Sequence, residues 1–349
     1  MELDARLNPG PSSVAERAQR LEAAGYTRAW THEERHDPFV ALGLAATTTE
    51  RLELGTNIAV AFARSPMTTA HTAWDLQMLS QGRFILGLGA QIKGHVTRRF
   101  SMPWSRPAAR MQEYVEALHA IWDTWEHGTK LDFRGDFYEH TITRAMFIPP
   151  RHPFGRPRIH LAAVGPLMTR VAGSVADGLL CHSFTTADYL RDVTLPNLRA
   201  AADAAGRAAE AVEVSQLAMV VAATAPESFE VQSRDIRERI AVIGSTPAYR
   251  GVLEHHGWGD AQTELLALFR QGRLADMVDV IDDEMLRTFA AVGTPTEVAD
   301  TLLERFGGLV DRITLMPAAD LPGAPSETSV LFPAEWDPLF ARLRNASRG

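Results

Sequence analysis

Short apolar runs alternate with amphipathic segments along most of the chain. Runs rich in β-branched and aromatic residues, bounded by turn residues, indicate buried strands. Eight such runs begin at Glu2, Tyr26, Leu52, Arg83, Ile159, Gly178, Val212 and Arg312. Helical patterns separate them, for example at residues 14–24, 66–80 and 106–126. Eight strand–helix repeats predict a (β/α)8 TIM barrel, with an open doubly wound sheet as the structural alternative.

Two segments are longer than a barrel crossover requires. Residues 127–158, after the fourth strand, are loop-rich and hold four prolines near their end. Residues 228–292, after the seventh strand, have a mostly helical pattern. We therefore expect one barrel domain over residues 1–349 with two insertions. The apolar helical insertion is compatible with a homodimer.

Composition narrows the class of protein. The 349 residues are 46% hydrophobic and 22% charged, which excludes a disordered chain. The net charge of −8 argues against nucleic acid or an anionic membrane as the main partner. The single cysteine, Cys181, lies in an apolar run, and we interpret it as a residue of the hydrophobic core. With no disulfide possible, no signal-peptide pattern and no long apolar stretch, we expect a cytoplasmic protein.

Positive charge is concentrated in two windows. Residues 76–112 contain six basic residues and no acid, and residues 140–176 contain five basic residues and no acid. The rest of the chain is strongly acidic. This pattern favours a small anionic ligand over an extended polyanion.

In a barrel, the active site lies where strands end and loops begin. After the second strand, residues 32–36 read HEERH, which matches the HExxH zinc signature. That signature requires a helix, and Pro38 disfavours a helix running through His36. The other interpretation is a loop that presents Glu33 and His36 for proton transfer.

Two further strand ends carry glycines. Residues 87–91 read GLGAQ, which permits close backbone approach and turns Gln91 toward a site. This is not a dinucleotide fingerprint, because Ile92 stands where the third glycine is needed. After the fifth strand, Gly165-Pro166 opens a helix whose free N–H groups suit an anion.

These strand ends together resemble the luciferase-like flavin and deazaflavin oxidoreductases, from residue 3 to about residue 316. The strongest mark is LSQGRFILGLG at residues 79–89. The others are AGYTRAW at 24–30, LGTNI at 54–58, AAVGP at 162–166 with ADG at 176–178, and VGTPTEV at 292–298. The whole is most similar to the branch that uses coenzyme F420, a deazaflavin.

The resemblance implies a cofactor ring over the strand ends. It places a non-proline cis peptide at Asn57-Ile58 behind the ring and phosphate contacts at Val164 and Gly165. By the same resemblance, the cofactor-binding residues are Asn57, Ile58, Gly89, Ala90, Gln91, Val164, Gly165 and Pro166.

The implied chemistry is hydride transfer between coenzyme F420 and a small organic substrate. Glu33 matches the family's acid after the second strand, and His36 is our candidate for its catalytic histidine. Gln91 replaces an acidic position and hydrogen-bonds without transferring a proton. The phosphate and glutamate tail of F420 fits the two basic windows.

Three alternatives remain open. A barrel binding reduced FMN would be a two-component monooxygenase served by a flavin reductase. A non-catalytic flavin-binding protein is the second, and a zinc hydrolase is the third. The aromatic residues between strands four and five form either a lid over an apolar substrate or internal packing: Trp104, Phe133, Phe137, Tyr138 and Phe147.

Overall fold

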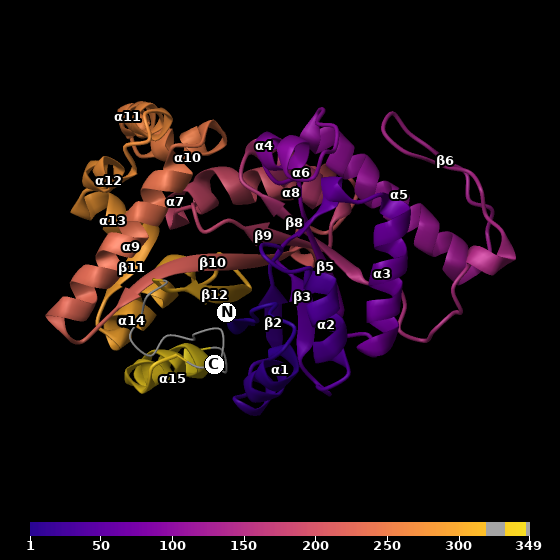
Figure 1. The fold of residues 1–349 in the computed structure, drawn as a ribbon, viewed down its shortest axis with the longest axis horizontal. Coiled ribbons are helices and arrows are strands. Elements are labelled where there is room, and N and C mark those ends of the chain that lie inside the picture. Colours follow the sequence, from indigo (N-terminus) through magenta and orange to yellow (C-terminus); the bar gives the residue numbers. More distant parts are fainter. Residues whose placement is uncertain (319–331, 347–349) are drawn as a thin grey trace.

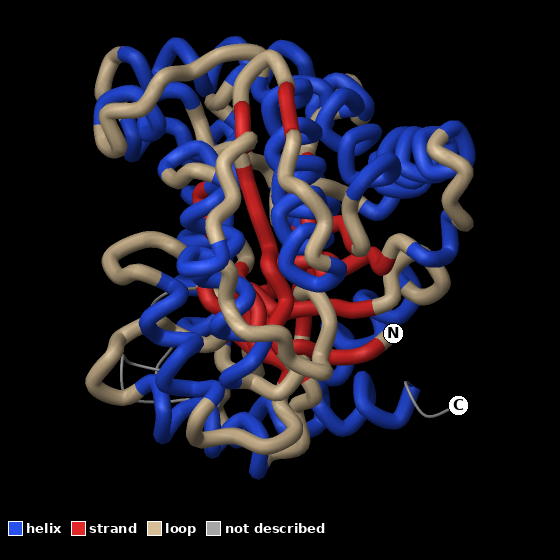
Figure 2. The backbone as a smooth tube through the Cα atoms, turned by 90° about the vertical axis from the view of Figure 1, so that its right-hand side faces the viewer, coloured by secondary structure: helices blue, strands red, loops and turns tan. Residues whose placement is uncertain are grey.

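The computed structural model describes residues 1–318 and 332–346. In this part of the chain, eight parallel strands close into a barrel surrounded by helices (Figure 1, Figure 2). Going round the barrel, they are β1 (Glu2–Arg6), β2 (Arg28–Thr31), β3 (Glu53–Thr56), β5 (Phe84–Gly89), β8 (Arg158–Ala163), β9 (Gly178–Cys181), β10 (Glu213–Ala222) and β12 (Arg312–Met316). Pairing of Glu2 with Arg312 completes the circle. The TIM barrel is thus confirmed, and the open sheet is excluded.

Helices on the outside of the barrel begin at residues suited to that position. Proline occupies the first turn of several, where its missing N–H costs nothing. Asp37, Ser65 and Thr294 accept backbone N–H bonds at three N-termini. The main helices of the layer are α1 (Val14–Ala23), α2 (Pro38–Ala46), α3 (Pro66–Leu79), α5 (Pro107–His127), α6 (Pro166–Val175), α8 (Leu195–Ala204), α14 (Pro295–Phe306) and α15 (Asp337–Ala346). None of the helices in the described chain combines the length and apolar run that a membrane crossing needs.

The segment after β10 builds a second core beside the barrel. It contains α9 (Pro226–Gly244), α10 (Arg250–His255), α11 (Gly259–Arg270), α12 (Leu274–Met277) and α13 (Asp283–Phe289), on the left in Figure 1. Their apolar faces pack around Ile240, Leu265 and Leu286. The helical pattern concealed one strand, β11 (Ala290–Gly293), which pairs with the far half of β10. This four-residue strand lies at the end of a 65-residue segment whose pattern is otherwise helical, so no separate signal for it is present in the sequence.

The segment after β5 includes α4 (Lys93–Arg98) and a hairpin of β6 (Phe133–Arg134) and β7 (Glu139–His140), with β6 on the right in Figure 1. Two of its aromatic residues, Trp104 and Tyr138, pack internally, whereas Phe147 is exposed. Trp104 contacts Phe62 edge-on at 6.0 Å between ring centroids, and Tyr138 contacts Tyr114 of α5 at 5.5 Å. These contacts support the packing interpretation for Trp104 and Tyr138.

Charged side chains fill the end of the barrel where the strands begin. Arg28 is buried and pairs with Glu53 and Glu213, while Arg312 pairs with Asp4. The Trp30 indole donates to Asp4 at 2.7 Å, one layer further along the axis. Above these groups, Trp30, Ile85 and Leu180 form an apolar layer. This end is closed, so the opposite end, where the strands terminate, holds the candidate site.

Candidate functional site

Strand alternation decides which side chains face the barrel axis. Asp4 and Trp30 meet inside the barrel, so Arg6 and His32, two residues further along their strands, point the same way. On β9, Leu180 faces inward, and His182 follows it two residues later. We call Arg6, His32 and His182, with the strand-end residues between them, the barrel mouth.

An apolar floor underlies the mouth. The peptide between Asn57 and Ile58 is cis, as expected from the sequence. The Ile58 side chain packs with Ala162 on the layer formed by Trp30, Ile85 and Leu180. A Cβ atom on Gly89 would come within 2.8 Å of Ile58, so only glycine fits beside it. A flat ring laid on this floor would meet hydrocarbon on its underside.

Hydrogen bonds fix the strands that carry this floor. Thr56 Oγ1 donates to the Gly87 carbonyl at 2.6 Å and accepts from the Gly87 N–H at 2.9 Å. A Cβ on Gly87 would lie 1.7 Å from the Thr56 carbonyl oxygen. Beyond the cis peptide, β4 (Ala59–Val60) resumes pairing with β5.

Glu33 is fully engaged by its neighbours. Its carboxylate is 7% exposed, accepts from Arg64 at 2.7 and 3.0 Å, and accepts from the Val60 N–H at 2.8 Å. Arg64 also binds Asp37, the N-cap of α2. Glu33 has the outward parity of its strand and ties the β2 end to β4. This geometry suits a positioning role better than the proton transfer predicted for it.

His36 is not held at the mouth by any contact within the described chain. It is exposed on a bend between β2 and α2 and makes no hydrogen bond within the described chain. His32 and His36 therefore do not share a helix face, and the geometry that the zinc signature requires is absent. The one group of three potential metal ligands within the described residues is Asp123, Glu126 and His127, on α5.

His32 is one of the two histidines that the fold brings to the mouth. Burial lowers its pKa, the Arg6 cation lowers it further, and Glu34 opposes both effects. The His32 Nε2 atom lies 3.6 Å from a Glu34 carboxylate oxygen, and the ring is 22% exposed. At neutral pH the imidazole is therefore neutral and able to accept a proton.

The helix opening after β8 offers free backbone donors. Gly165 is the N-cap of α6, Pro166 follows it, and no side chain caps the helix. A Cβ on Gly165 would meet nothing within 4 Å, so the backbone is open to a ligand. A small cavity of about 10 Å³, enough for one water, lies beside it and is lined partly by Val164 and His182.

His182 has a defined tautomer. Its Nδ1 accepts from the Phe184 N–H at 3.0 Å, which leaves the proton on Nε2. Burial lowers the pKa of His182 to about 4, so the ring is a neutral hydrogen-bond donor. It packs on Tyr249 of the insertion, with 4.9 Å between ring centroids. Beside it, burial raises the pKa of Cys181 to about 12, which agrees with a core cysteine.

The Gln91 side chain hydrogen-bonds to the backbone of the next residue. Gln91 has φ of +59°, and its Oε1 accepts from the Ile92 N–H at 3.0 Å. Ala90 and Gln91 are both half-buried at the end of β5. Their place at a strand end is as predicted, and their contact with a ligand stays a prediction.

The two basic windows do not form one surface. Arg83 donates to backbone carbonyls of Ala46, Thr49 and Leu52, and Arg110 is buried against Tyr138. Arg158 belongs to the closed end of the barrel, where it pairs with Glu53. Internal pairing of these cations removes them from ligand binding, so the windows overstate the positive charge available at the mouth.

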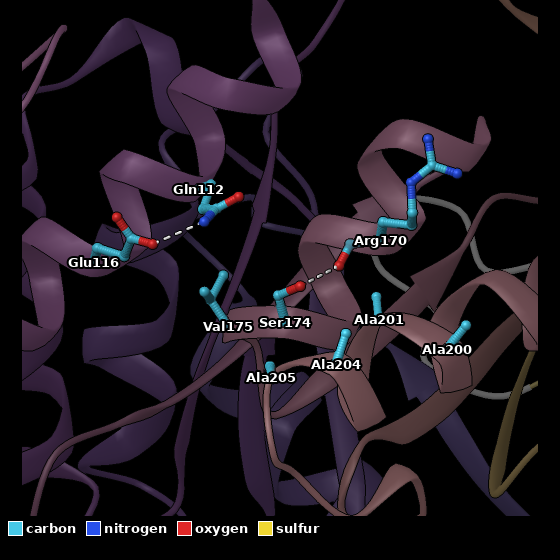
Figure 3. Close-up of a pocket in the computed structure, with 9 residues that line it drawn as sticks. All are labelled: Gln112, Glu116, Arg170, Ser174, Val175, Ala200, Ala201, Ala204 and Ala205. Atoms are coloured by element: carbon cyan, nitrogen blue, oxygen red, sulfur yellow. Dashed lines mark hydrogen bonds between the residues drawn. The ribbon is translucent and has the colours of Figure 1, made fainter.

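A larger groove, of about 550 Å³, lies outside the barrel between α5, α6 and α8 (Figure 3). Alanines of α8 form one wall, and Gln112, Glu116, Arg170 and Ser174 lie on the other two helices. Gln112 donates to Glu116 at 2.9 Å, and Ser174 donates to the Arg170 carbonyl at 3.0 Å. No residue of the mouth lines this groove, so we assign the candidate site to the mouth.

Sequence reasoning missed Arg6 and did not select His32 or His182. The signal was available in the alternation along each strand. Trp30 is the large apolar residue that must face inward, which places His32 inward and Glu33 outward. Arg6 was missed because the charged residues Glu2, Asp4 and Arg6 occupy every second position of the strand. This pattern is typical of a strand face that is exposed to solvent.

Comparison with known proteins identifies relatives over most of the chain. An uncharacterized protein of Mycobacterium tuberculosis is 48% identical over 313 residues, 90% of this chain and 92% of that protein. The 5,10-methylenetetrahydromethanopterin reductase of Methanopyrus kandleri is 25% identical over 84% of this chain and 85% of that protein.

The solved structure of the coenzyme F420-dependent tetrahydromethanopterin reductase from Methanopyrus kandleri shares the fold. Its TM-score is 0.71 with 20% identity, covering 94% of this chain and 95% of that chain. The family model described as luciferase-like monooxygenase matches residues 2–312. With a barrel, a cis peptide and open strand ends already in place, the chain belongs to the luciferase-like monooxygenase family.

Proposed function

We propose that this protein is an oxidoreductase that transfers hydride between coenzyme F420 and a small organic substrate at the barrel mouth. The observation that carries the proposal is the His32 imidazole, two residues beyond Trp30 of the apolar floor and 3.6 Å from Glu34, because hydride transfer to or from a hydroxyl carbon also requires a proton acceptor or donor. The reductase relative described above supports the choice of a deazaflavin.

The residues present fit that cofactor. The floor of Ile58 and Ala162 suits one face of a planar ring, and Gly89 leaves room for Ile58 to lie flat against it. The uncapped N-terminus of α6 at Gly165 suits a phosphate, because its N–H groups are free and the helix dipole favours negative charge there. F420, when bound, would supply the hydride acceptor or donor.

The chain's own residues would then handle the proton. In the oxidation of an alcohol, His32 Nε2 accepts the hydroxyl proton as the hydride leaves carbon, and Glu34 at 3.6 Å stabilises the resulting imidazolium. In the reverse direction His32 returns the proton. Glu33 holds Arg64 and the β4 backbone in place and takes no part in the transfer.

Cofactor titration tests the proposal. The purified protein is titrated separately with F420 and with FMN, following quenching of tryptophan fluorescence. We expect submicromolar binding of F420 and binding of FMN at least tenfold weaker. Tight FMN binding with weak F420 binding would contradict the proposal and favour the two-component monooxygenase, and binding of neither would reject both cofactors.

Two histidine variants test the assignment of the proton acceptor. With any substrate that the F420-loaded enzyme turns over, H32Q is expected to lower kcat by about 10²–10⁴-fold. H36Q is the matched control, because His36 is exposed and four residues away, and it should change kcat by less than about twofold. A larger loss in H36Q than in H32Q would return the role to His36.

A further inference from the structure

His182 presents one hydrogen-bond donor to the barrel mouth. Its Nδ1 atom accepts from the Phe184 N–H at 3.0 Å, so the ring proton lies on Nε2. Within the described chain Nε2 has no hydrogen-bond partner, and unlike both ring nitrogens of His160 it is not enclosed by protein. The Nε2–H group is therefore free to donate to a ligand.

The insertion after β10 holds this ring in place. Tyr249, in the turn before α10, packs on His182 with 4.9 Å between ring centroids and on Phe184 with 5.4 Å. The Phe184 N–H fixes the rotation of the imidazole, and the Tyr249 ring covers one side of it. A donor that is already held in one orientation loses little entropy when a ligand accepts from it.

His182 is a neighbour of the uncapped N-terminus of α6. The strands β8 and β9 pair in parallel with Ala163 opposite Cys181. The residues that follow, Val164 and His182, are thus about 5 Å apart across the strands, and both line the same small cavity. Gly165, the N-cap of α6, comes directly after Val164. The imidazole donor and the free helix N–H groups therefore lie side by side at the mouth.

The elements that carry these donors bring no acid to the mouth. Residues 160–187, which include most of β8 and all of α6 and β9, contain a single acid, Asp177. Its carboxylate accepts from the Ile159 N–H at 2.8 Å, where the two strands begin, at the opposite end of the barrel from His182. The α6 dipole adds partial positive charge at its N-terminus. This corner of the mouth therefore suits an anion.

We infer that the Nε2–H of His182 donates to the phosphate of the bound cofactor, beside the backbone N–H groups at the start of α6. The inference rests on the proposed function, which places that phosphate at Gly165. It assigns Tyr249 the role of a positioning residue, so that the insertion contributes to cofactor binding. Because β2 and β9 lie on opposite sides of the closed barrel, this role is separate from proton transfer by His32.

The test compares cofactors with and without the phosphate. The full chain without cofactor is titrated, by tryptophan quenching, with F420 and with its deazariboflavin core, which has the same ring and ribityl chain. H182N keeps an acceptor for the Phe184 N–H but removes the Nε2 donor, so it should raise the Kd for F420 by about tenfold or more. The Kd for the core should not change. H182Q, whose amide N–H reaches the Nε2 position, should bind F420 almost as the wild type does.

Three further variants test the positioning role and the specificity of the effect. Y249F keeps the ring that packs on His182 and should bind F420 as the wild type does, whereas Y249A should bind it more weakly. H127N, at the exposed C-terminal end of α5, is the matched histidine control and should leave both Kd values unchanged. If H182N does not fold, the Y249A and Y249F pair applies the same comparison through the contact that holds the ring.

The outcomes separate the inference from the proposed function. A loss of affinity for F420 but not for the core in H182N, with the melting temperature retained, supports the phosphate contact. Unchanged F420 binding in H182N, or an equal loss for both ligands, would overturn it and leave F420 as the cofactor. If the wild type binds FMN in place of F420, a loss of affinity for FMN but not for riboflavin in H182N would keep the contact and refute the cofactor. Binding of none of the four would refute both.

Discussion

Replacing Glu33 by Gln tests whether this carboxylate positions the mouth. The glutamine amide oxygen would still accept the Val60 N–H, but its NH₂ group would face the Arg64 guanidinium in place of a carboxylate oxygen. Arg64 retains its ion pair with Asp37 at 3.0 Å, and its side chain is 17% exposed. Its positive charge is therefore only partly uncompensated in the variant. Charge-assisted hydrogen bonds contribute about 1.5–3 kcal/mol each, and the retained contacts place the cost of E33Q at about 2 kcal/mol.

For a chain of 349 residues, about 2 kcal/mol corresponds to a fall in Tm of about 3 °C. Urea unfolding and calorimetry measure both quantities. E16Q is the control, because Glu16 forms an exposed pair with Arg20 that contributes less than about 0.5 kcal/mol. If E33Q destabilises the protein no more than E16Q, or if it removes the proton-transfer limb of the pH–rate profile, the positioning role is refuted.

Three further predictions concern the packing of the barrel. G87A should prevent folding into soluble protein, because its Cβ would overlap the Thr56 carbonyl, whereas G165A should leave expression and Tm unchanged. Cys181 should not react with a thiol reagent until the protein is unfolded, since burial raises its pKa to about 12. Burial lowers the pKa of His160 to about 3, below its value in the unfolded chain, so falling pH from 6.5 favours unfolding. H160L, which removes two buried ring nitrogens that make no hydrogen bond within the described chain, should lessen the stability lost between pH 7 and pH 5 by about 2 kcal/mol in urea titrations.

The fold was readable from the sequence because each barrel strand is a short apolar run with a helix behind it. All eight strand starts were predicted to within two residues of those observed. β11 was missed because it depends on pairing with the extended end of β10. That pairing is a tertiary contact, and a run of four residues carries no local signal for it.

The site was less predictable, because it depends on which way side chains point. Val164, Gly165, Gly89 and Ile58 were found through the strand-end rule and the resemblance. Loop order along the chain pointed to His36, whereas strand parity favours His32.

The most direct test of the account is a crystal structure of the protein with F420 bound. We expect the deazaflavin ring against Ile58 and Ala162, its phosphate on the N–H groups at the start of α6, and its open face toward His32. A cofactor bound in the groove between α5, α6 and α8, or a ring in the mouth that leaves His32 out of reach of the transferring carbon, would contradict the proposed function.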